Sequence, residues 1–80
     1  MDKEQLIAQL AEIMSDIIDC PVEFTEQTTA ADIEKWDSLV QMSFMLIIEQ
    51  TYEIELGLDE ITHFANIGEL ADMIIKKKGA

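Results

Sequence analysis

The sequence contains no arginine, and its few lysines are far outnumbered by acidic residues. Five lysines stand against 17 aspartates and glutamates, which gives a formal net charge of −12 at pH 7. Nucleic acids and anionic lipid surfaces are bound mainly through cationic side chains, so both are poor partners for this chain. A basic patch on another protein is the partner that this charge favours, unless the acidity serves only to keep the domain in solution.

Cysteine and histidine each occur once, as Cys20 and His63. A single cysteine cannot form an internal disulfide, and the two residues do not supply the ligand set of a zinc site. The spaced aspartates and glycine of a calcium-binding loop are also missing, so we expect no metal site. Cys20 precedes Pro21 and has no histidine near it in the sequence to raise its thiolate fraction, so a structural role fits it better than a catalytic one.

Long apolar segments are missing as well, since the longest uninterrupted run spans residues 44–48. A helix that crosses a bilayer needs about 20 apolar residues, and the opening MDKEQLIAQL lacks the apolar stretch of a signal peptide. We therefore expect a cytoplasmic protein with no membrane insertion. Its 80 residues predict a single domain over residues 1–80, with little room for a deep enclosed active site.

Apolar residues at helical spacing predict a first helix that ends by Cys20, because Pro21 disfavours helical geometry in the residue before it. Asp2 and Gln5 suit a capping box at the start of this helix. The periodicity then disappears, and threonines and acids dominate residues 19–36. Loops longer than about 12–15 residues are uncommon in compact domains and tend to be functional, so we expect an ordered, functional loop here.

A second helix is predicted over residues 38–52 with Asp37 as its N-cap, and a last helix after Asn66, which can form a capping pair with Glu69. Between these helices, residues 59–64 suggest one or two turns of a short third helix. The predicted fold is therefore all-α, a small four-helix bundle with three longer helices, one short third helix and a long loop between the first two.

The predicted second helix has apolar residues on two sides when its residues are placed at intervals of about 100°. We assign one stripe to the core, and its members are Phe44, Met45, Ile48 and Tyr52. The other stripe has the spacing i, i+3 and i+7, and its members are Leu39, Met42 and Leu46. Burial of both stripes is hard to arrange in so small a bundle, so we assign the second stripe to partner docking. The alternative is that the second stripe packs on the last helix or on the long loop.

Ser38 stands in the first turn of this helix, where free backbone N–H groups and the positive end of the helix dipole attract anions such as phosphate. Serine is also simply common at helix starts. A nucleophilic role would need a base within hydrogen-bond reach, and the fold would have to bring the only histidine, His63, to that place. No G-x-S-x-G elbow is present, so an enzyme is the weakest hypothesis.

The residues Asp37-Ser38-Leu39 resemble the D-S-L signature at the start of the second helix in the acyl carrier protein family. The resemblance extends over nearly the whole chain, through an amphipathic first helix, a Thr-rich loop, W-D-S-L, the segment IEQTYEIEL, a short acidic third helix and FANIGELADMI. Three matching residues alone would carry little weight, whereas this order and spacing make the resemblance specific.

The resemblance implies a carrier and not an enzyme. A phosphopantetheinyl transferase would use coenzyme A and magnesium to attach 4′-phosphopantetheine to Ser38, with Asp37 helping to present the serine. Acyl groups would travel as thioesters on this arm, in fatty-acid, polyketide or related biosynthesis. The implied partners are that transferase, an acyl-loading ligase or acyltransferase, and a ketosynthase or other acyl-processing enzymes. We expect the carrier to be a monomer.

Members of this family can shelter the acyl chain between their helices, and the matching positions are Phe44, Ile48, Leu56, Ile61, Phe64 and Leu70. Ile61 and Leu70 stand where many fatty-acid carriers have a small residue, which implies a tightly packed interior with less room for a long chain. Acids that are common along the second helix of such carriers are replaced here by Val40, Ser43 and Gln50. Docking is therefore expected to rest on apolar contact through Leu39, Val40, Met42 and Leu46. These departures suggest a specialised carrier, for polyketide or another secondary pathway.

Two alternatives remain open beside the acyl carrier. An aminoacyl or D-alanyl carrier would share the fold and the arm, although peptidyl carriers usually have G-G-[HD]-S where this chain has K-W-D-S. An acidic helical interaction module would share the fold and never be modified. A mass measurement after incubation with a transferase and coenzyme A separates this module from the carriers.

Overall fold

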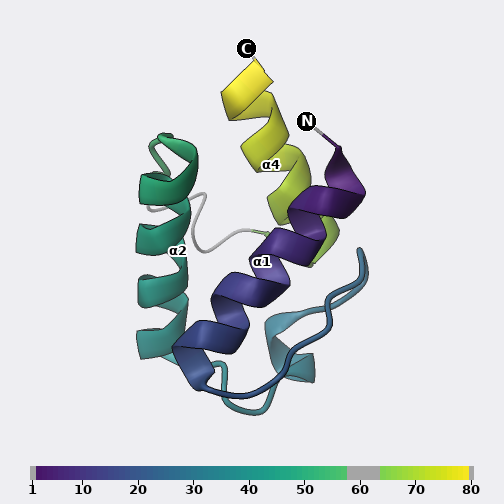
Figure 1. Ribbon diagram of the computed structural model, residues 1–80, viewed down its shortest axis with the longest axis vertical. Coiled ribbons are helices and arrows are strands. Elements are labelled where there is room, and N and C mark those ends of the chain that lie inside the picture. Colours follow the sequence, from purple (N-terminus) through teal and green to yellow (C-terminus); the bar gives the residue numbers. More distant parts are fainter. Residues whose placement is uncertain (1, 58–63, 80) are drawn as a thin grey trace.

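The computed structural model describes residues 2–57 and 64–79. Within these ranges the regular structure is entirely helical and contains no strand, which confirms the predicted all-α class. The elements in chain order are α1 (Lys3–Ile18), the 3₁₀ helix η1 (Ala30–Asp32), α2 (Ser38–Tyr52) and α4 (Ile67–Gly79), as Figure 1 shows. The short third helix predicted over 59–64 falls, except for its last residue, outside the described residues.

The ends of α1 follow from local side-chain chemistry. The Asp2 carboxylate accepts the Glu4 backbone N–H at 3.0 Å, so this end has a simple N-cap and the predicted capping box with Gln5 is not formed. The helix ends at Ile18, and the next residue, Asp19, caps it in a left-handed conformation with φ 53°. The Cys20 N–H then bonds to the Ser15 carbonyl at 3.2 Å, which satisfies one of the last carbonyls of the helix.

The starts of α2 and α4 confirm the predicted caps. The Asp37 carboxylate accepts the Val40 N–H at 2.9 Å, and α2 begins at the next residue, Ser38. At α4 the Asn66 side-chain oxygen accepts the Glu69 N–H at 2.9 Å, while the Glu69 carboxylate accepts the N–H of Ala65 at 3.3 Å. Both starts are determined by short-range contacts, which explains why the sequence alone predicted them.

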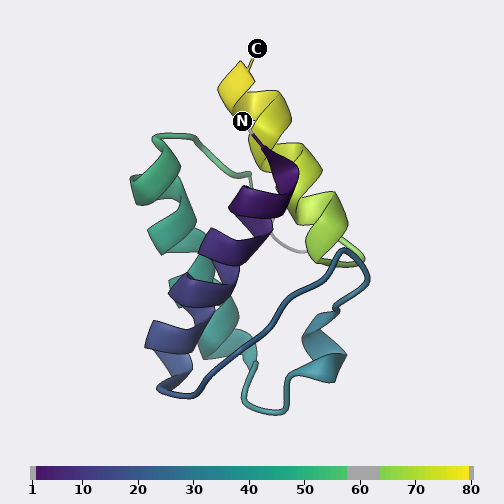
Figure 2. The ribbon, with the colours of Figure 1, turned by 45° about the vertical axis from the view of Figure 1, so that its right-hand side comes forward.

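The core forms where α1 packs against both α2 and α4 (Figures 1 and 2). Each of the three helices contributes its apolar face to one cluster, because a helix of a small bundle must bury that face against its neighbours. The largest fully buried side chains are Leu6, Leu10, Met14, Phe44, Met45, Ile48, Ile67, Leu70 and Ile74. The predicted core stripe of α2 is confirmed, since all four of its members are buried.

The segment between α1 and α2 is an ordered loop with its own hydrogen bonds. The Thr25 N–H donates to the Thr28 hydroxyl at 2.8 Å, and Thr28 is the one buried polar residue among those described. The loop is fastened to the start of α4 by backbone bonds from Ile67 N–H to the Thr28 carbonyl at 2.8 Å and from Gly68 N–H to the Glu26 carbonyl at 2.9 Å. The threonines that mark this segment in the sequence therefore hold its shape.

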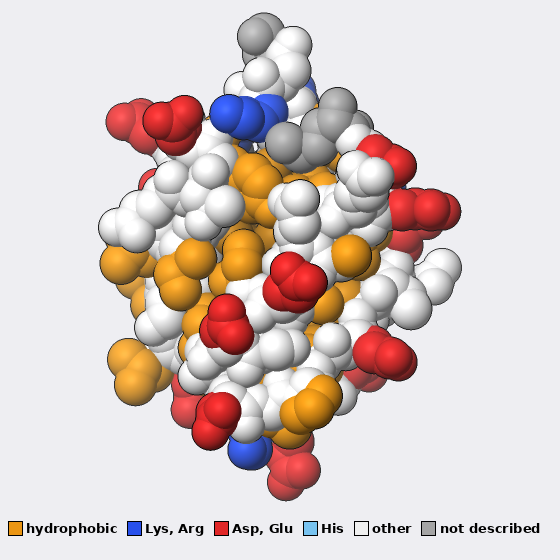
Figure 3. All heavy atoms as spheres, in the orientation of Figure 1, with side chains coloured by type: hydrophobic (Ala, Val, Ile, Leu, Met, Phe, Trp, Pro, Cys, Tyr) orange, Lys and Arg blue, Asp and Glu red, His pale blue; other side chains and the backbone are white. Residues whose placement is uncertain are grey.

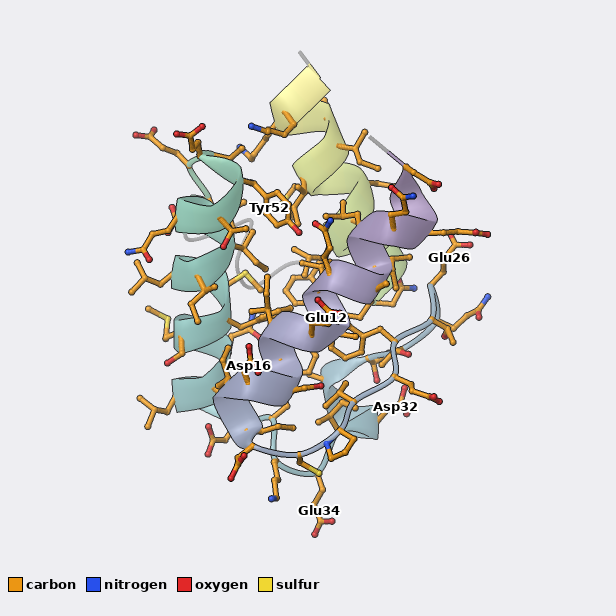
Figure 4. The ribbon with its side chains drawn as sticks, viewed as in Figure 1. Glu12, Asp16, Glu26, Asp32, Glu34 and Tyr52 are labelled. Atoms are coloured by element: carbon orange, nitrogen blue, oxygen red, sulfur yellow. The ribbon has the colours of Figure 1, made fainter. Side chains whose placement is uncertain are left out.

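Acidic side chains are spread over the face that carries α1, and Figure 3 shows few lysines among them. Glu12 and Asp16 point outward along the helix in Figure 4. One lysine joins three segments, since Lys3 Nζ lies 2.7 Å from a Glu26 carboxylate oxygen in the loop and 3.0 Å from an Asp72 carboxylate oxygen on α4. These hydrogen bonds raise the pKa of Lys3, with Glu26 the larger cause.

Candidate functional site

The predicted attachment residue, Ser38, is the first residue of α2 and is exposed. Within residues 2–57 and 64–79 its hydroxyl has no hydrogen-bond partner. The neighbouring Asp37 is also exposed, and it holds the helix start through its bond to Val40 and through its carbonyl, which accepts the Gln41 N–H at 2.9 Å. The serine is therefore accessible from solvent while its backbone is held by the first turn of the helix.

The start of α2 suits a phosphate group. The N–H groups of Ser38 and Leu39 come before the first intrahelical bond of α2, which runs from Gln41 to Asp37. The positive end of the helix dipole lies at the same place and favours an anion there. A phosphodiester attached to the serine oxygen would therefore lie beside groups that stabilise its negative charge.

An aromatic cluster lies directly before the exposed serine. Trp36 is only 8% exposed, and its ring centroid lies 5.4 Å from that of Phe44 in an edge-to-face arrangement. The rings of Phe24 and Phe64 lie 6.0 and 6.3 Å from it. The indole N–H donates to the side-chain oxygen of Gln41 at 2.6 Å. Sequence reasoning missed Trp36 and Gln41 as residues of this site, because a side-chain bond across five residues has no regular helical spacing.

The second stripe of α2 is exposed along its length, with Leu39 at 77%, Met42 at 56% and Leu46 at 55%. Hydrophobic side chains are visible along the edge of the molecule that α2 forms in Figure 3. The stripe is therefore not buried on α4 or on the loop, which was the alternative that the sequence left open. Val40, predicted to belong to the same surface, is instead partly buried and packs against the core. Its neighbour four residues later on the same side is Phe44, which lies in the core.

A small hollow of about 240 Å³ lies beside this stripe, lined by Met42, Ser43, Met45, Leu46 and Glu49. Its described lining is mostly apolar and includes Glu49. The Glu49 carboxylate already accepts the Leu56 N–H at 2.9 Å, which ties α2 to the segment after it. The hollow thus offers room for one apolar side chain of a partner protein, and Glu49, the acid among its described lining residues, is hydrogen-bonded within the domain.

The residues predicted to shelter an acyl chain lie together in the core cluster where the structure describes them. Phe44, Ile48, Leu56 and Leu70 are buried, and Phe64 is partly buried against the same cluster. Ile61 lies outside the described residues. A different hollow, of about 750 Å³, lies between α1 and residues 22–25 of the loop, and none of these side chains is among its described lining residues.

The scarce reactive residues do not gather into a second site in the described part of the chain. Cys20 is partly buried and forms no disulfide. No group of histidine, cysteine and acidic side chains among the described residues could hold a metal ion. His63 lies outside the described residues, so its distance to Ser38 is not part of the structure. No helix among the described residues is long and apolar enough to cross a membrane.

A helical domain that presents an accessible serine at the start of its second helix, next to exposed apolar side chains, has the features of a carrier domain. The family model for the phosphopantetheine attachment site matches residues 8–74, so the chain belongs to that family. It is similar to the solution NMR structure of holo acyl carrier protein from Geobacter metallireducens, with a TM-score of 0.83 and 34% identity over 91% of this chain and 85% of that one. A search of curated proteins found no match.

Membership of this family confirms the predicted resemblance and assigns the chain a carrier role and not a catalytic one. Its cofactor is phosphopantetheine, which a phosphopantetheinyl transferase attaches. When bound, the arm supplies a terminal thiol that holds cargo as a thioester. The accessible hydroxyl and the anion-stabilising helix start fit this group.

Proposed function

We propose that the chain is an acyl carrier protein, folded as one carrier domain over residues 1–80, that carries acyl intermediates as thioesters on 4′-phosphopantetheine attached to Ser38. The observation that supports this most directly is the accessible hydroxyl of Ser38, which has no partner among the described residues, at the first position of α2, directly after the Asp37 cap. The aspartate and the serine occupy the D-S positions of the family signature, which supports the assignment. Fatty-acid, polyketide or a related biosynthesis would supply the cargo.

The attachment chemistry needs one nucleophile from this chain. The Ser38 oxygen attacks the phosphorus of coenzyme A that bears the pantetheine, the phosphodiester to the serine forms, and adenosine 3′,5′-bisphosphate leaves. The transferase supplies the base that takes the serine proton, together with the magnesium ion. Asp37 contributes by fixing the turn that presents the serine, because its carboxylate holds the Val40 N–H.

Partner docking is proposed to rest on the exposed stripe of Leu39, Met42 and Leu46. An exposed apolar surface of this kind suits burial against an apolar patch of a partner enzyme. Val40 contributes less, because part of its side chain already packs in the core. The net charge of −12 would mainly speed the encounter with basic partners. The proposed partners are the transferase, a loading ligase or acyltransferase, and a ketosynthase or other acyl-processing enzymes.

The interior is proposed to receive the acyl chain among the core side chains of Phe44, Ile48, Leu56, Phe64 and Leu70, together with Ile61. Three of these residues, Phe44, Ile48 and Leu70, are 0% exposed, so a guest chain would have to displace packed side chains. Short acyl groups should therefore be favoured over long ones, which fits a specialised pathway.

The deciding experiment is intact-mass measurement after incubation with a broad-specificity transferase, magnesium and coenzyme A. The wild type should gain one phosphopantetheine, Ser38→Ala should gain none, and Thr51→Ala, which removes another exposed hydroxyl of α2, should be modified like the wild type. An unmodified wild type would support the unmodified interaction module instead. The mass of the protein recovered from its native host would then identify the cargo and separate an acyl carrier from an aminoacyl or D-alanyl carrier.

A further inference from the structure

Trp36 makes two kinds of contact that together fix the chain just before Ser38. Its ring is packed against Phe44 of α2 and against Phe24 and Phe64, which lie in other segments. Its indole N–H donates to Gln41 Oε1 at 2.6 Å, a short bond for this pair of groups. The residue is 8% exposed although the serine two positions later is open to solvent.

The D-S-L signature lies between the two ends of the Trp36–Gln41 hydrogen bond in the sequence. Asp37 and Ser38 lie between its ends in the sequence, and inside the same stretch the Gln41 N–H is bonded to the Asp37 carbonyl at 2.9 Å. On the other side, the Trp36 N–H is bonded to the Ile33 carbonyl at 3.1 Å. The direction in which the chain enters α2 is therefore set by a buried ring and a side-chain bond in addition to the cap.

We infer that Trp36 and Gln41 are positioning residues for phosphopantetheine transfer, acting together as a clamp that holds Ser38 in the orientation that the transferase needs. The inference rests on the proposed attachment at Ser38. The exposed serine has no side-chain partner among the described residues, so the orientation of its oxygen depends on the backbone that carries it. Displacing a reacting atom by about 1 Å can cost up to about a hundredfold in rate, so a bond that limits backbone rotation here affects the chemical step.

The other end of α2 offers a closely matched control. There the Tyr52 hydroxyl donates to Gln9 Oε1 at 2.7 Å, so an aromatic donor again meets a glutamine acceptor. Both aromatic residues are nearly buried, Tyr52 at 5% and Trp36 at 8%. Removing either bond should reduce stability to a similar extent, whereas only the clamp lies next to the serine.

The test is steady-state transfer kinetics with a phosphopantetheinyl transferase and coenzyme A, well below the melting temperature of each variant. Trp36→Phe and Gln41→Leu should each lower kcat by about tenfold while the KM for coenzyme A is unchanged. Gln41→Glu keeps an oxygen that can accept the indole N–H and should restore most of the rate. The control variants Tyr52→Phe and Gln9→Leu should transfer at the wild-type rate.

A double variant shows whether the two residues act through their shared bond. Trp36→Phe combined with Gln41→Leu should be no slower than either single variant, because each alone already removes the bond. If the rate losses of the two single variants multiplied in the double variant, Gln41 would act through a contact other than its bond to Trp36, and this would overturn the clamp. Gln41→Leu leaves every ring of the cluster in place, so it remains decisive if Trp36→Phe does not fold.

Two failures are distinguishable in this experiment. A wild type that gains no phosphopantetheine would overturn the attachment site and the clamp together. A modified wild type whose Trp36→Phe and Gln41→Leu variants react at the same rate, although they melt at a lower temperature, would overturn the clamp alone and leave the proposed carrier function standing.

Discussion

The Glu49 carboxylate accepts the Leu56 backbone N–H, with 2.9 Å between Oε2 and N. Glu49 is the only acidic residue in the sequence of α2, and this bond uses it to tie the helix to the segment that follows. The exposed stripe of α2 is therefore accompanied by no other carboxylate of its own helix. We therefore expect a partner that docks on this helix, as proposed, to gain most of its short-range binding free energy from apolar contact.

Leu46→Ala tests this apolar docking. Leu46 is 55% exposed, so its truncation should change the free energy of unfolding by less than about 0.5 kcal/mol. The KM for the carrier in the transferase reaction should rise by about tenfold, equal to about 1.4 kcal/mol, with kcat unchanged. Urea unfolding and transfer kinetics measure the two effects separately.

The matched control for this substitution is Ile48→Ala on the opposite side of the same helix. Ile48 is 0% exposed, so the same truncation type should cost about 2–5 kcal/mol of unfolding free energy. If Leu46→Ala were as destabilising as Ile48→Ala, Leu46 would be a core residue and the docking assignment would be wrong.

Gly68→Ala tests the close contact between α4 and the loop. A Cβ atom at Gly68 would lie 2.9 Å from the Glu26 carbonyl oxygen, which the Gly68 N–H itself bonds. Because the clashing oxygen belongs to the backbone, the loop must move. We expect the free energy of unfolding, measured with urea, to fall by about 1–3 kcal/mol. Gly79→Ala meets nothing within 4 Å and should cost no stability. Equal stability of the two variants would show that the loop yields without cost.

The sequence predicted the features of this domain that arise from neighbouring residues. The start of α2 at Ser38 follows from Asp37, whose carboxylate reaches only three residues ahead. Val40 was placed on the docking surface because it stands where the resembling carriers often have an acid, yet it lies four residues before Phe44 and shares its side of the helix. That spacing was visible in the sequence and would have predicted partial burial.

Other contacts depend on segments that are distant in sequence and could not be predicted from spacing. The hydrogen bond between Glu26 and Gly68 connects the loop to a helix some forty residues later in the sequence, and no local sequence pattern predicts it. The bond between Tyr52 and Gln9 likewise needs the packing of α2 on α1. The proposed attachment segment around Ser38 was therefore easier to predict than the tertiary contacts that hold it.

Tyr52 gives the protein a pH-dependent stability at the alkaline end. Its side chain extends from α2 toward α1 in Figure 4, and burial raises its pKa above the usual value of 10.0. A folded-state pKa that lies above the unfolded one contributes stability in full below pH 10.0, and this stability is lost as the pH rises through the folded pKa. Tyr52 is the single tyrosine, so tyrosinate absorbance reports its titration directly.

Tyr52→Phe serves as the control for this titration. Lys3 also has a raised pKa and contributes stability that is lost as the pH rises through its own folded-state pKa. The unfolding free energy of Tyr52→Phe, measured with urea, should therefore still fall at alkaline pH, but less steeply with pH than that of the wild type. A tyrosinate titration in which the pKa of Tyr52 is at or below the usual value of 10.0 would contradict the effect of burial.

Lys3 tests whether charge placement or net charge governs stability. Lys3→Met removes the contacts to Glu26 and Asp72, whereas Lys35→Met removes a lysine that forms no ion pair in the described part of the chain. Each change takes the formal net charge from −12 to −13, by the loss of one positive charge. The melting temperature should fall further for Lys3→Met, because the carboxylates it joins are left facing each other.

Salt should reduce the difference in melting temperature between the two lysine variants. Added sodium chloride screens the repulsion among the acidic side chains, so the melting temperature of the wild type should rise with ionic strength. The difference in melting temperature between Lys3→Met and Lys35→Met should become smaller as the ionic strength rises, since exposed ion pairs are screened as well. Thermal melts of the three proteins from low to high salt measure both trends. If the two variants melted together at every salt concentration, the net charge alone would account for the effect and the bridge across α1, the loop and α4 would contribute nothing.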